Sequence, residues 1–386
     1  MLRYLPLIVR NAWRNRRRTT LTILSVGISM CLVGVLMAVY YAFYLSDPTP
    51  EQALRLVTRN RVSLTFAMPQ SYRERIRQVP GVREVMISQW YGGTYKDSRD
   101  PKNMFARFAI EPEKLFTIYG ELHIPEEQKQ AFLHERTACV ISRDLARNLG
   151  ARLGDRITLT GDIFPGTMEF TVLGIFDIPR RSDVLYFNRE YLEESLPERR
   201  RGNAGTFVIL MDKPDSASRI ANEIDEMFRN STVQTRTETE QAFVLSFVSF
   251  LGNVKMFLIG ICAAVLFTIL LVSANTMAMS VRERVREVGV LKTLGFTRSA
   301  ILGLMLGESC AISIIGGLIG FALSIMLTQA VSRSPFGGFL PTIRPLQPAV
   351  AAACVGTALA IGVISSLIPA WNASGTPIVT ALRSTD

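Results

Sequence analysis

Residues 243–300 read FVLSFVSFLGNVKMFLIGICAAVLFTILLVSANTMAMSVRERVREVGVLKTLGFTRSA, and this stretch decides the fold. No charged residue occurs from Met256 to Val281, which is long enough for a helix of about 20 residues to cross a bilayer. A charged segment from Arg282 to Glu287 follows directly. The join therefore predicts a membrane-spanning helix that leads into a charged helix at the membrane surface.

The charged segment also carries apolar residues at helical spacing. Val281, Val285, Val288 and then Leu291 or Lys292 recur at steps of three to four residues, so they share one face of a helix, and most of the charges lie elsewhere on it. Such a helix is either an amphipathic element between two spans or a docking surface for a soluble partner. The spacing alone does not separate these two interpretations.

The order of residues across this join resembles a known family. Asn275-Thr276-Met277, Ser280 to Arg284, Arg286 to Lys292 and Leu294-Gly295 are similar to the cytoplasmic-loop signature of FtsX-like ABC transporter permeases, which include the permease part of the MacB exporter. The resemblance implies a homodimer, or a heterodimer with a related permease, and a separate cytoplasmic ABC ATPase docked on a coupling helix at residues 281–298. The residues it assigns to that coupling helix are Val281, Arg282, Glu283, Arg284, Val285, Arg286, Glu287, Val288, Gly289, Leu291, Leu294 and Gly295.

Composition fits membrane spans combined with a polar domain. The 386 residues carry a formal net charge of +10, yet much of the excess lies beside apolar spans, where the positive-inside rule explains it without nucleic acid as a partner. Cys31, Cys262, Cys310 and Cys354 fall in apolar segments, and Cys139 is alone in the polar region, so no internal disulfide is expected there. The expected partners include the lipid bilayer.

The sequence predicts no catalytic, cofactor or metal site. His123 and His134 do not show a metal-binding spacing with Cys139, and we find no GxxxxGK[ST], HExxH or GxSxG motif. The chain is therefore not expected to be an enzyme, and ATP and Mg²⁺ are expected on the partner ATPase.

The other apolar segments predict three further spans. The sequence as a whole therefore predicts an α-helical membrane protein with four transmembrane helices and a large α+β extracytoplasmic domain between helices 1 and 2. A signal peptide would have a shorter apolar core, so the first segment predicts a retained anchor. The predicted order is a basic cytoplasmic segment (1–18), helix 1 (19–46), the extracytoplasmic domain (47–243), a stalk with helix 2 (244–280), the coupling helix (281–298), helix 3 (299–331), an outer loop (332–347), helix 4 (348–370) and a cytoplasmic tail (371–386).

The sequence of the extracytoplasmic domain predicts short strands that alternate with short helices. Ser142 caps a helix that ends at Gly150, and the strands that follow resemble the core domain of MacB-like permeases. Trp90, Tyr91, Tyr95, Phe132 and Phe164 are candidates for a binding surface, with the ordinary core as the competing interpretation. The run from Ala242 onward predicts that helix 2 begins above the membrane and continues through it as a stiff lever.

Helix 3 carries two features of interest. Glu308 is an ionisable residue inside a span, which is expected either to take part in gating or to pair with a nearby arginine. Gly316 and Gly320 form a GxxxG spacing, which allows close helix contact within the bundle or across a dimer.

Together these features predict the permease subunit of a MacB/FtsX-like ABC transporter in the bacterial cytoplasmic (inner) membrane, with both termini cytoplasmic. It would convert ATP binding and hydrolysis on the partner into movement of the extracytoplasmic domains, for export or extrusion, with a periplasmic adaptor as a further candidate partner. The alternative is a non-transporting signalling subunit that regulates an extracellular partner such as a cell-wall hydrolase. A membrane-anchored sensor or enzyme without an ATPase is the remaining class.

Overall fold

The computed structural model describes residues 15–45, 48–164, 166–179, 182–250, 253–333 and 348–378, with the side chains of 247–250 and 332–333 left aside. Most of the predicted basic segment (1–18), most of the predicted outer loop (332–347) and the second half of the predicted tail (371–386) lie outside the described residues. The chain divides into two compact units: a helical unit formed by residues around 15–45, 253–331 and 348–378, and an α/β domain formed by residues between 48 and 250.

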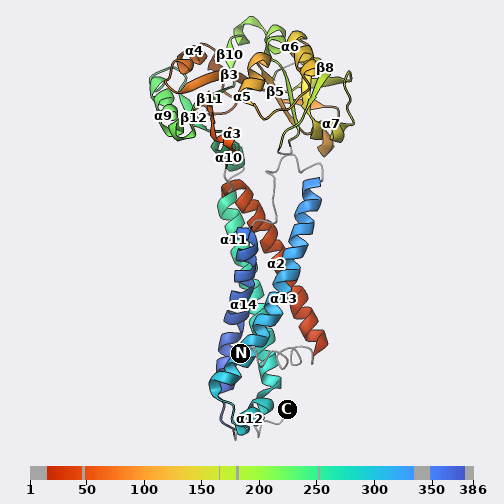
Figure 1. The fold of residues 1–386 in the computed structure, drawn as a ribbon, viewed down its shortest axis with the longest axis vertical. Helices are drawn as coiled ribbons and strands as arrows, with labels where there is room; N and C mark the ends of the chain where they lie inside the picture. Colours follow the sequence, from red (N-terminus) through yellow and green to blue (C-terminus); the bar gives the residue numbers. More distant parts are fainter. Residues whose placement is uncertain are drawn as a thin grey trace. The chain divides into compact units, whose positions relative to one another are not determined.

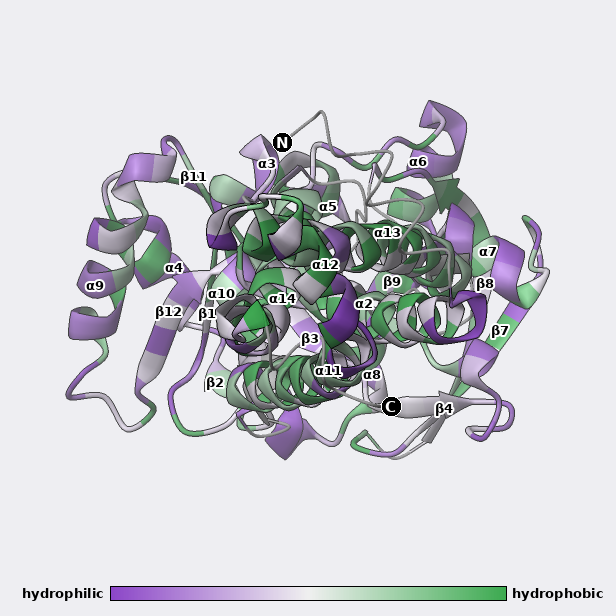
Figure 2. Ribbon diagram, turned by 90° about the horizontal axis from the view of Figure 1, so that it is seen from below, coloured by the Kyte–Doolittle hydropathy of each residue, from purple (hydrophilic) through white to green (hydrophobic). Residues whose placement is uncertain are grey.

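The helical unit contains four helices long and apolar enough to span a membrane: α2 (Arg16–Tyr44), α11 (Val254–Glu283), α13 (Arg298–Arg333) and α14 (Pro348–Gly375). The short helix α12 (Val285–Thr293) lies between α11 and α13 (Figure 1). Apolar residues cover most of the long helices, whereas α6 (Glu126–His134) and α9 (Ala217–Met227) of the α/β domain carry many hydrophilic ones (Figure 2). The predicted fold class, four apolar helices with a large α/β domain between the first and second, is confirmed.

The predicted continuous lever is wrong. Helix α10 is described over Glu240–Phe250, and α11 begins at Val254, directly after Asn253, whose backbone (φ −77°, ψ 67°) is not helical. The Asn253 side chain caps α11 by accepting a hydrogen bond from the Met256 backbone N–H at 3.1 Å. Asparagine is a favoured N-cap residue because its side chain satisfies an otherwise free N–H at the helix start.

The α/β domain is built on a mixed ten-stranded sheet in the order β12-β1-β11-β3-β5-β9-β6-β8-β7-β4, with β10 and β2 forming a small second sheet. The pairs β5–β9 and β6–β8 are parallel and the remaining pairs are antiparallel. The strands are β1 (Arg55–Asn60), β2 (Met68–Pro69), β3 (Val82–Trp90), β4 (Gly93–Tyr95), β5 (Ala106–Ile110), β6 (Ala138–Ser142), β7 (Arg156–Gly161), β8 (Gly166–Phe176), β9 (Val184–Asn188), β10 (Asn203–Ala204), β11 (Thr206–Met211) and β12 (Thr235–Thr239).

Short helices connect these strands. They are α3 (Pro50–Ala53), α4 (Tyr72–Arg77), α5 (Pro112–Ile118), α6 (Glu126–His134), α7 (Arg143–Leu149), α8 (Arg189–Ser195), α9 (Ala217–Met227) and α10, with 3₁₀ turns at Pro101–Asn103, Glu198–Arg200 and Pro214–Ser216. The prediction for α7 is confirmed: the Ser142 hydroxyl accepts from the Leu145 N–H at 3.2 Å, and Gly150 takes the left-handed conformation (φ +69°) that ends the helix.

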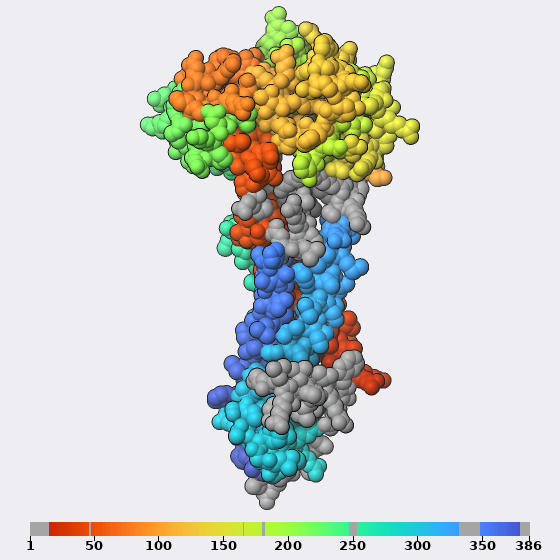
Figure 3. Space-filling model, in the orientation of Figure 1, coloured from red at the N-terminus to blue at the C-terminus, as the bar shows by residue number. Residues whose placement is uncertain are grey.

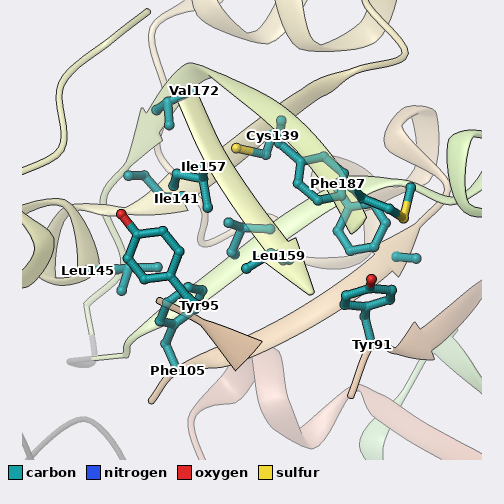
Figure 4. Close-up of a cluster of buried hydrophobic side chains, with 14 of the residues drawn as sticks. Tyr91, Tyr95, Phe105, Cys139, Ile141, Leu145, Ile157, Leu159, Val172 and Phe187 are labelled. Carbon is teal, nitrogen blue, oxygen red and sulfur yellow. The ribbon is translucent and has the colours of Figure 1, made fainter. Parts of the chain in front are cut away.

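Three apolar clusters support the sheet. In one of them Tyr91 packs edge-on against Phe187 at 5.7 Å, and Cys139 is buried among the same side chains (Figure 4). Burial raises the pKa of the Cys139 thiol, so this cysteine is an inert core residue. Of the aromatic residues considered as surface candidates, Tyr91, Tyr95 and Phe132 are buried, while Trp90 is exposed.

Candidate coupling site

The join between α11 and α12 is a break in the helix at Arg284. Its backbone N–H donates to the Val281 carbonyl at 3.1 Å, and its φ of −115° departs from helical geometry. The Arg284 guanidinium, whose side chain is 14% exposed, donates to Glu308 of α13 at 2.6 Å. Pairing with a nearby arginine, one of the two roles considered for Glu308, is therefore what the structure contains.

The apolar face of the join packs against its own chain. Val281 and Val288, the latter only 2% exposed, belong to one cluster with residues of α13 and α14, namely Ile301, Met305, Ala370 and Ala373. Leu291 is partly buried against the same cluster, and Gly289 is buried. The face that the spacing grouped together thus anchors α12 to the helical unit.

A second face of α12 points away from this cluster. Val290 is 47% exposed and Leu294 is 71% exposed, and Arg286, four residues before Val290, is exposed as well. We call Arg286, Val290 and Leu294 the outward face. Leu294 is among the predicted coupling residues, whereas Val290, which lies within the resembling segment Arg286 to Lys292, is not.

The remaining predicted residues surround these two faces. Arg282 and Glu283 are exposed, whereas Val285 and Glu287 are half-buried. Helix α12 ends at Thr293, short of the predicted residue 298, because Gly295 adopts φ +89° and the Phe296 N–H returns to the Leu291 carbonyl at 3.1 Å. Glycine tolerates this left-handed conformation, which turns the chain from α12 into α13.

Polar contacts fix both ends of the join to other helices. Arg18 of α2 pairs with Glu283 at 2.6 Å and donates to the Ser280 hydroxyl at 2.9 Å. At the other end, the Lys292 ammonium donates to the carbonyl of Thr376, just beyond α14, at 2.5 Å. The join is therefore held by α2, α13 and the end of α14 together.

The GxxxG pair of α13 makes its close contact within the bundle. A Cβ atom on Gly320 would lie 2.4 Å from the Gly27 carbonyl oxygen of α2, and one on Gly316 would lie 2.8 Å from the Val26 side chain. Helix α13 (light blue) also packs against α14 (dark blue), as Figure 3 shows. At this contact a Cβ atom on Gly317 would lie 2.6 Å from the Cβ atom of Ala358. The GxxxG spacing therefore allows a close helix contact within the chain itself.

The α/β domain contains a charged network that the sequence did not indicate. The Arg55 side chain is 2% exposed, and its guanidinium donates to both Glu121 oxygens at 2.9 and 2.6 Å and to Glu240 at 2.7 Å. Burial lowers the pKa of Arg55, but Glu240 and Glu121 outweigh it and raise that pKa above its usual value. Tyr119, whose own pKa is raised by burial, covers the guanidinium with its ring at 4.5 Å. The network joins the first strand of the domain to the first residue of α10.

No group of three His, Cys, Asp or Glu side chains that could hold a metal ion occurs among the described residues. Four apolar helices and an α/β domain between the first two define the class as a multi-pass membrane protein with an extracytoplasmic domain.

The family follows from the match of both parts. The MacB-like periplasmic core domain matches residues 19–227, and the FtsX-like permease C-terminal domain matches residues 243–378. The chain belongs to the MacB/FtsX family of ABC transporter permeases.

Relatives include proteins of similar length and proteins of which the chain matches only a part. An uncharacterized ABC transporter permease, MJ1507 of Methanocaldococcus jannaschii, is 24% identical over 97% of this chain and 96% of its own length. The ABC transporter permease YtrF of Bacillus subtilis is 27% identical over 58% of this chain and 54% of its length. The macrolide export ATP-binding/permease protein MacB of Bordetella avium is 28% identical over 38% of this chain and 21% of its length.

Among solved structures, the periplasmic region of MacB from Actinobacillus actinomycetemcomitans has a TM-score of 0.37 at 10% identity, covering 51% of this chain and 92% of that one. The extracellular domain of the transporter YknZ has a TM-score of 0.35 at 14% identity, covering 48% of this chain and 99% of that one.

Proposed function

We propose that this chain is the membrane subunit that converts ATP binding and hydrolysis on a separate cytoplasmic ATPase into movement of the α/β domain, in the service of export. The observation that carries the proposal is the two-sided character of α12. Val288 is locked into the helical unit, while Val290 and Leu294 leave apolar surface uncovered beside Arg286. An exposed apolar pair next to a cation suits a protein partner with an apolar groove and an acidic rim.

A push on the outward face would reach the other helices through contacts already described. The cluster around Val288 would move α13 and α14, the Arg284–Glu308 pair would carry α13, and the Arg18–Glu283 pair would carry α2. Packed cores transmit displacement because they are dense and resist compression. In this proposal the mechanical unit is the four-helix bundle, rather than a single rod formed by α10 and α11.

The names of the relatives favour export over signalling. Among the similar proteins are ones named for macrolide export and for pyoverdine export. The proposed arrangement has both termini in the cytoplasm, Mg²⁺ and ATP on the partner, and a dimer of identical or related permeases. Export also suggests a periplasmic adaptor, whereas capture of a cell-wall hydrolase in its place would favour the signalling role.

The docking surface can be tested by charge substitution. We would purify the chain in nanodiscs with the ATPase it captures and compare Val290→Asp/Leu294→Asp with the control Ser299→Asp, which places a carboxylate at another exposed position near α12. The outward-face variant is expected to lose capture about ten-fold or more, because a buried unpaired carboxylate is strongly unfavourable at an apolar interface. Val288→Asp is unsuitable as the probe, since Val288 belongs to the core cluster.

Thermal unfolding of both variants checks that the helical unit stays folded. Undiminished capture by the folded Val290→Asp/Leu294→Asp protein would remove the docking assignment. An equal loss in Ser299→Asp would show that added charge, rather than the outward face, is responsible.

A further inference from the structure

A cleft of about 1480 Å³ lies over one face of the central sheet in the α/β domain, and many of the strand residues at its floor are themselves buried. Its floor consists of side chains at alternate positions of five neighbouring strands, β1, β11, β3, β5 and β9. Alternate residues of a strand point to the same side, so the cleft follows one continuous sheet face. These floor residues are Arg55, Val57, Arg59, Thr206, Val208, Met86, Ser88, Trp90, Ala106, Phe108, Val184 and Tyr186. Small-molecule sites typically occupy about 300–1,000 Å³, so the cleft has room for an extended ligand.

Exposed apolar side chains are concentrated around this cleft. Among the described residues of the α/β domain, seven large apolar side chains are exposed, and four of them line the cleft: Val62, Trp90, Ile163 and Val244. The other three are Phe66, Met104 and Leu153. Apolar surface gathered in a concavity indicates a binding site for an apolar group, whereas the same residues scattered singly would not.

Two arginines at the cleft lack a carboxylate partner within the described residues. Arg61 donates to the Gln234 side-chain oxygen at 3.3 Å, and Arg200 donates to the Ile163 carbonyl at 3.4 Å. By contrast, the lining arginines Arg55, Arg59, Arg189 and Arg236 all form ion pairs. A guanidinium that bonds only neutral groups retains its capacity to bind a carboxylate or phosphate.

Strand register places these cations at one end of the cleft. Arg59 of β1 lies opposite Thr206 of β11, and Thr206 lies opposite Ser88 of β3. Arg61, two residues after Arg59, and Trp90, two residues after Ser88, therefore lie at the same end of the sheet. Ile163, which contacts Arg200, donates its N–H to the Gly92 carbonyl just after Trp90. Among the residues that the structure describes, Glu51 is the lining carboxylate without an ion pair. It precedes the opposite end of β1, where α10 contributes Phe243 and Val244.

We propose that this cleft binds an anionic amphiphile, a molecule with an extended apolar chain and a carboxylate or phosphate head. Arg61 and Arg200 hold the head, Trp90 and Ile163 contact the start of the chain, and the chain runs along the sheet toward Val244. The assignment is independent of ATPase docking, because it concerns only the α/β domain.

Tryptophan quenching provides a direct test. The full-length chain contains Trp13, Trp90 and Trp371, so Trp13→Phe/Trp371→Phe leaves Trp90 as the sole reporter. In nanodiscs of unbrominated lipid, dibromostearate and a brominated lysophosphatidate serve as carboxylate and phosphate probes, and a brominated alkyltrimethylammonium serves as the cationic control. Saturable quenching by at least one anionic probe is expected, and which probe binds more tightly distinguishes a free fatty acid from a phospholipid-derived ligand.

Charge removal sharpens the test. Arg61→Gln/Arg200→Gln should raise the apparent Kd about ten-fold or more, because two charge-assisted contacts are lost. Arg99→Gln/Arg152→Gln, which removes the same charge at exposed positions outside the cleft, should leave it unchanged. The proposal is overturned if neither anionic probe saturates, if the cationic probe quenches equally well, or if both double variants bind alike. Since no ATPase is present, failure here leaves the docking test unaffected.

Discussion

Two arginines tie a helix end to its surroundings in the two units, and they do so differently. In the α/β domain, Arg55 is 2% exposed and meets two carboxylates, Glu121 and Glu240. In the helical unit, Arg284 is 14% exposed and pairs with Glu308 beside an apolar cluster. The first contact is a closed network around a buried cation, and the second is an ion pair at the margin of a hydrophobic contact.

The difference between these two contacts indicates how firmly each one holds the helix beside it. Removing one member of a deeply buried ion network leaves a charge that neither water nor protein neutralises, so such a network resists rearrangement. The Arg284–Glu308 pair has a single carboxylate, 6% exposed, and a guanidinium that is 14% exposed, so separating it breaks one ion pair where the Arg55 network would lose two. We therefore expect Arg55 to act as a fixed anchor for α10 and Arg284 to act as a joint that tolerates movement of α12.

The largest effect is expected from breaking the fixed anchor. Arg55→Met should lower the free energy of unfolding of the α/β domain by about 3–5 kcal/mol, because Glu121 and Glu240 would remain largely buried without their cation. Denaturant unfolding followed by near-ultraviolet circular dichroism measures this change. Arg55→Met/Glu121→Gln/Glu240→Gln, which removes the stranded charges, should recover much of the loss. A loss below about 1 kcal/mol in the single variant would mean that the network is not an anchor.

A smaller effect is expected at the joint. Glu308→Gln keeps a side-chain oxygen near Arg284 but removes the charge, so the loss should be about 1–3 kcal/mol. Thermal unfolding in detergent, carried through a double-mutant cycle with Arg284→Gln, isolates the energy of the pair. If the cycle gave a coupling energy as large as the loss in Arg55→Met, the two arginines would be equivalent and the distinction between anchor and joint would disappear.

The sequence predicted those structural features that depend only on residues close together in the chain. The four spans follow from uncharged apolar runs, and helix α7 follows from Ser142 and Gly150 at its ends, because both signals are local. The Arg55 network was invisible, since Glu121 lies 66 residues away from Arg55 and Glu240 lies 185 residues away. Only the folded sheet brings these three positions together.

At the candidate coupling site the periodicity grouped Val281, Val288 and Leu291, which do pack together, but it could not say what covers their face. Val281 and Val288 do share a face, and it packs on Ile301 and Ala370 of the same chain. Val290 and Leu294 are also apolar and also four residues apart, but they lie on an exposed face of the helix. Hydrophobicity at helical spacing therefore does not distinguish a core position from a docking position. The separation of α10 from α11 was missed because Asn253 is a weak signal inside a long apolar run.

The smallest effect is expected at the third charged contact, Arg18–Glu283, and it tests whether exposure orders the three. The Glu283 side chain is 47% exposed, so water already solvates its charge and salt screens the pair. Glu283→Gln should therefore cost less than about 1 kcal/mol, and the loss should shrink further between about 0.05 and 0.5 M salt. Melting temperatures at both salt concentrations measure it, with Glu226→Gln at the exposed Arg229 pair as the control. A loss exceeding that of Glu308→Gln would show that the position of the contact on α2, rather than its burial, determines how strongly the join is held.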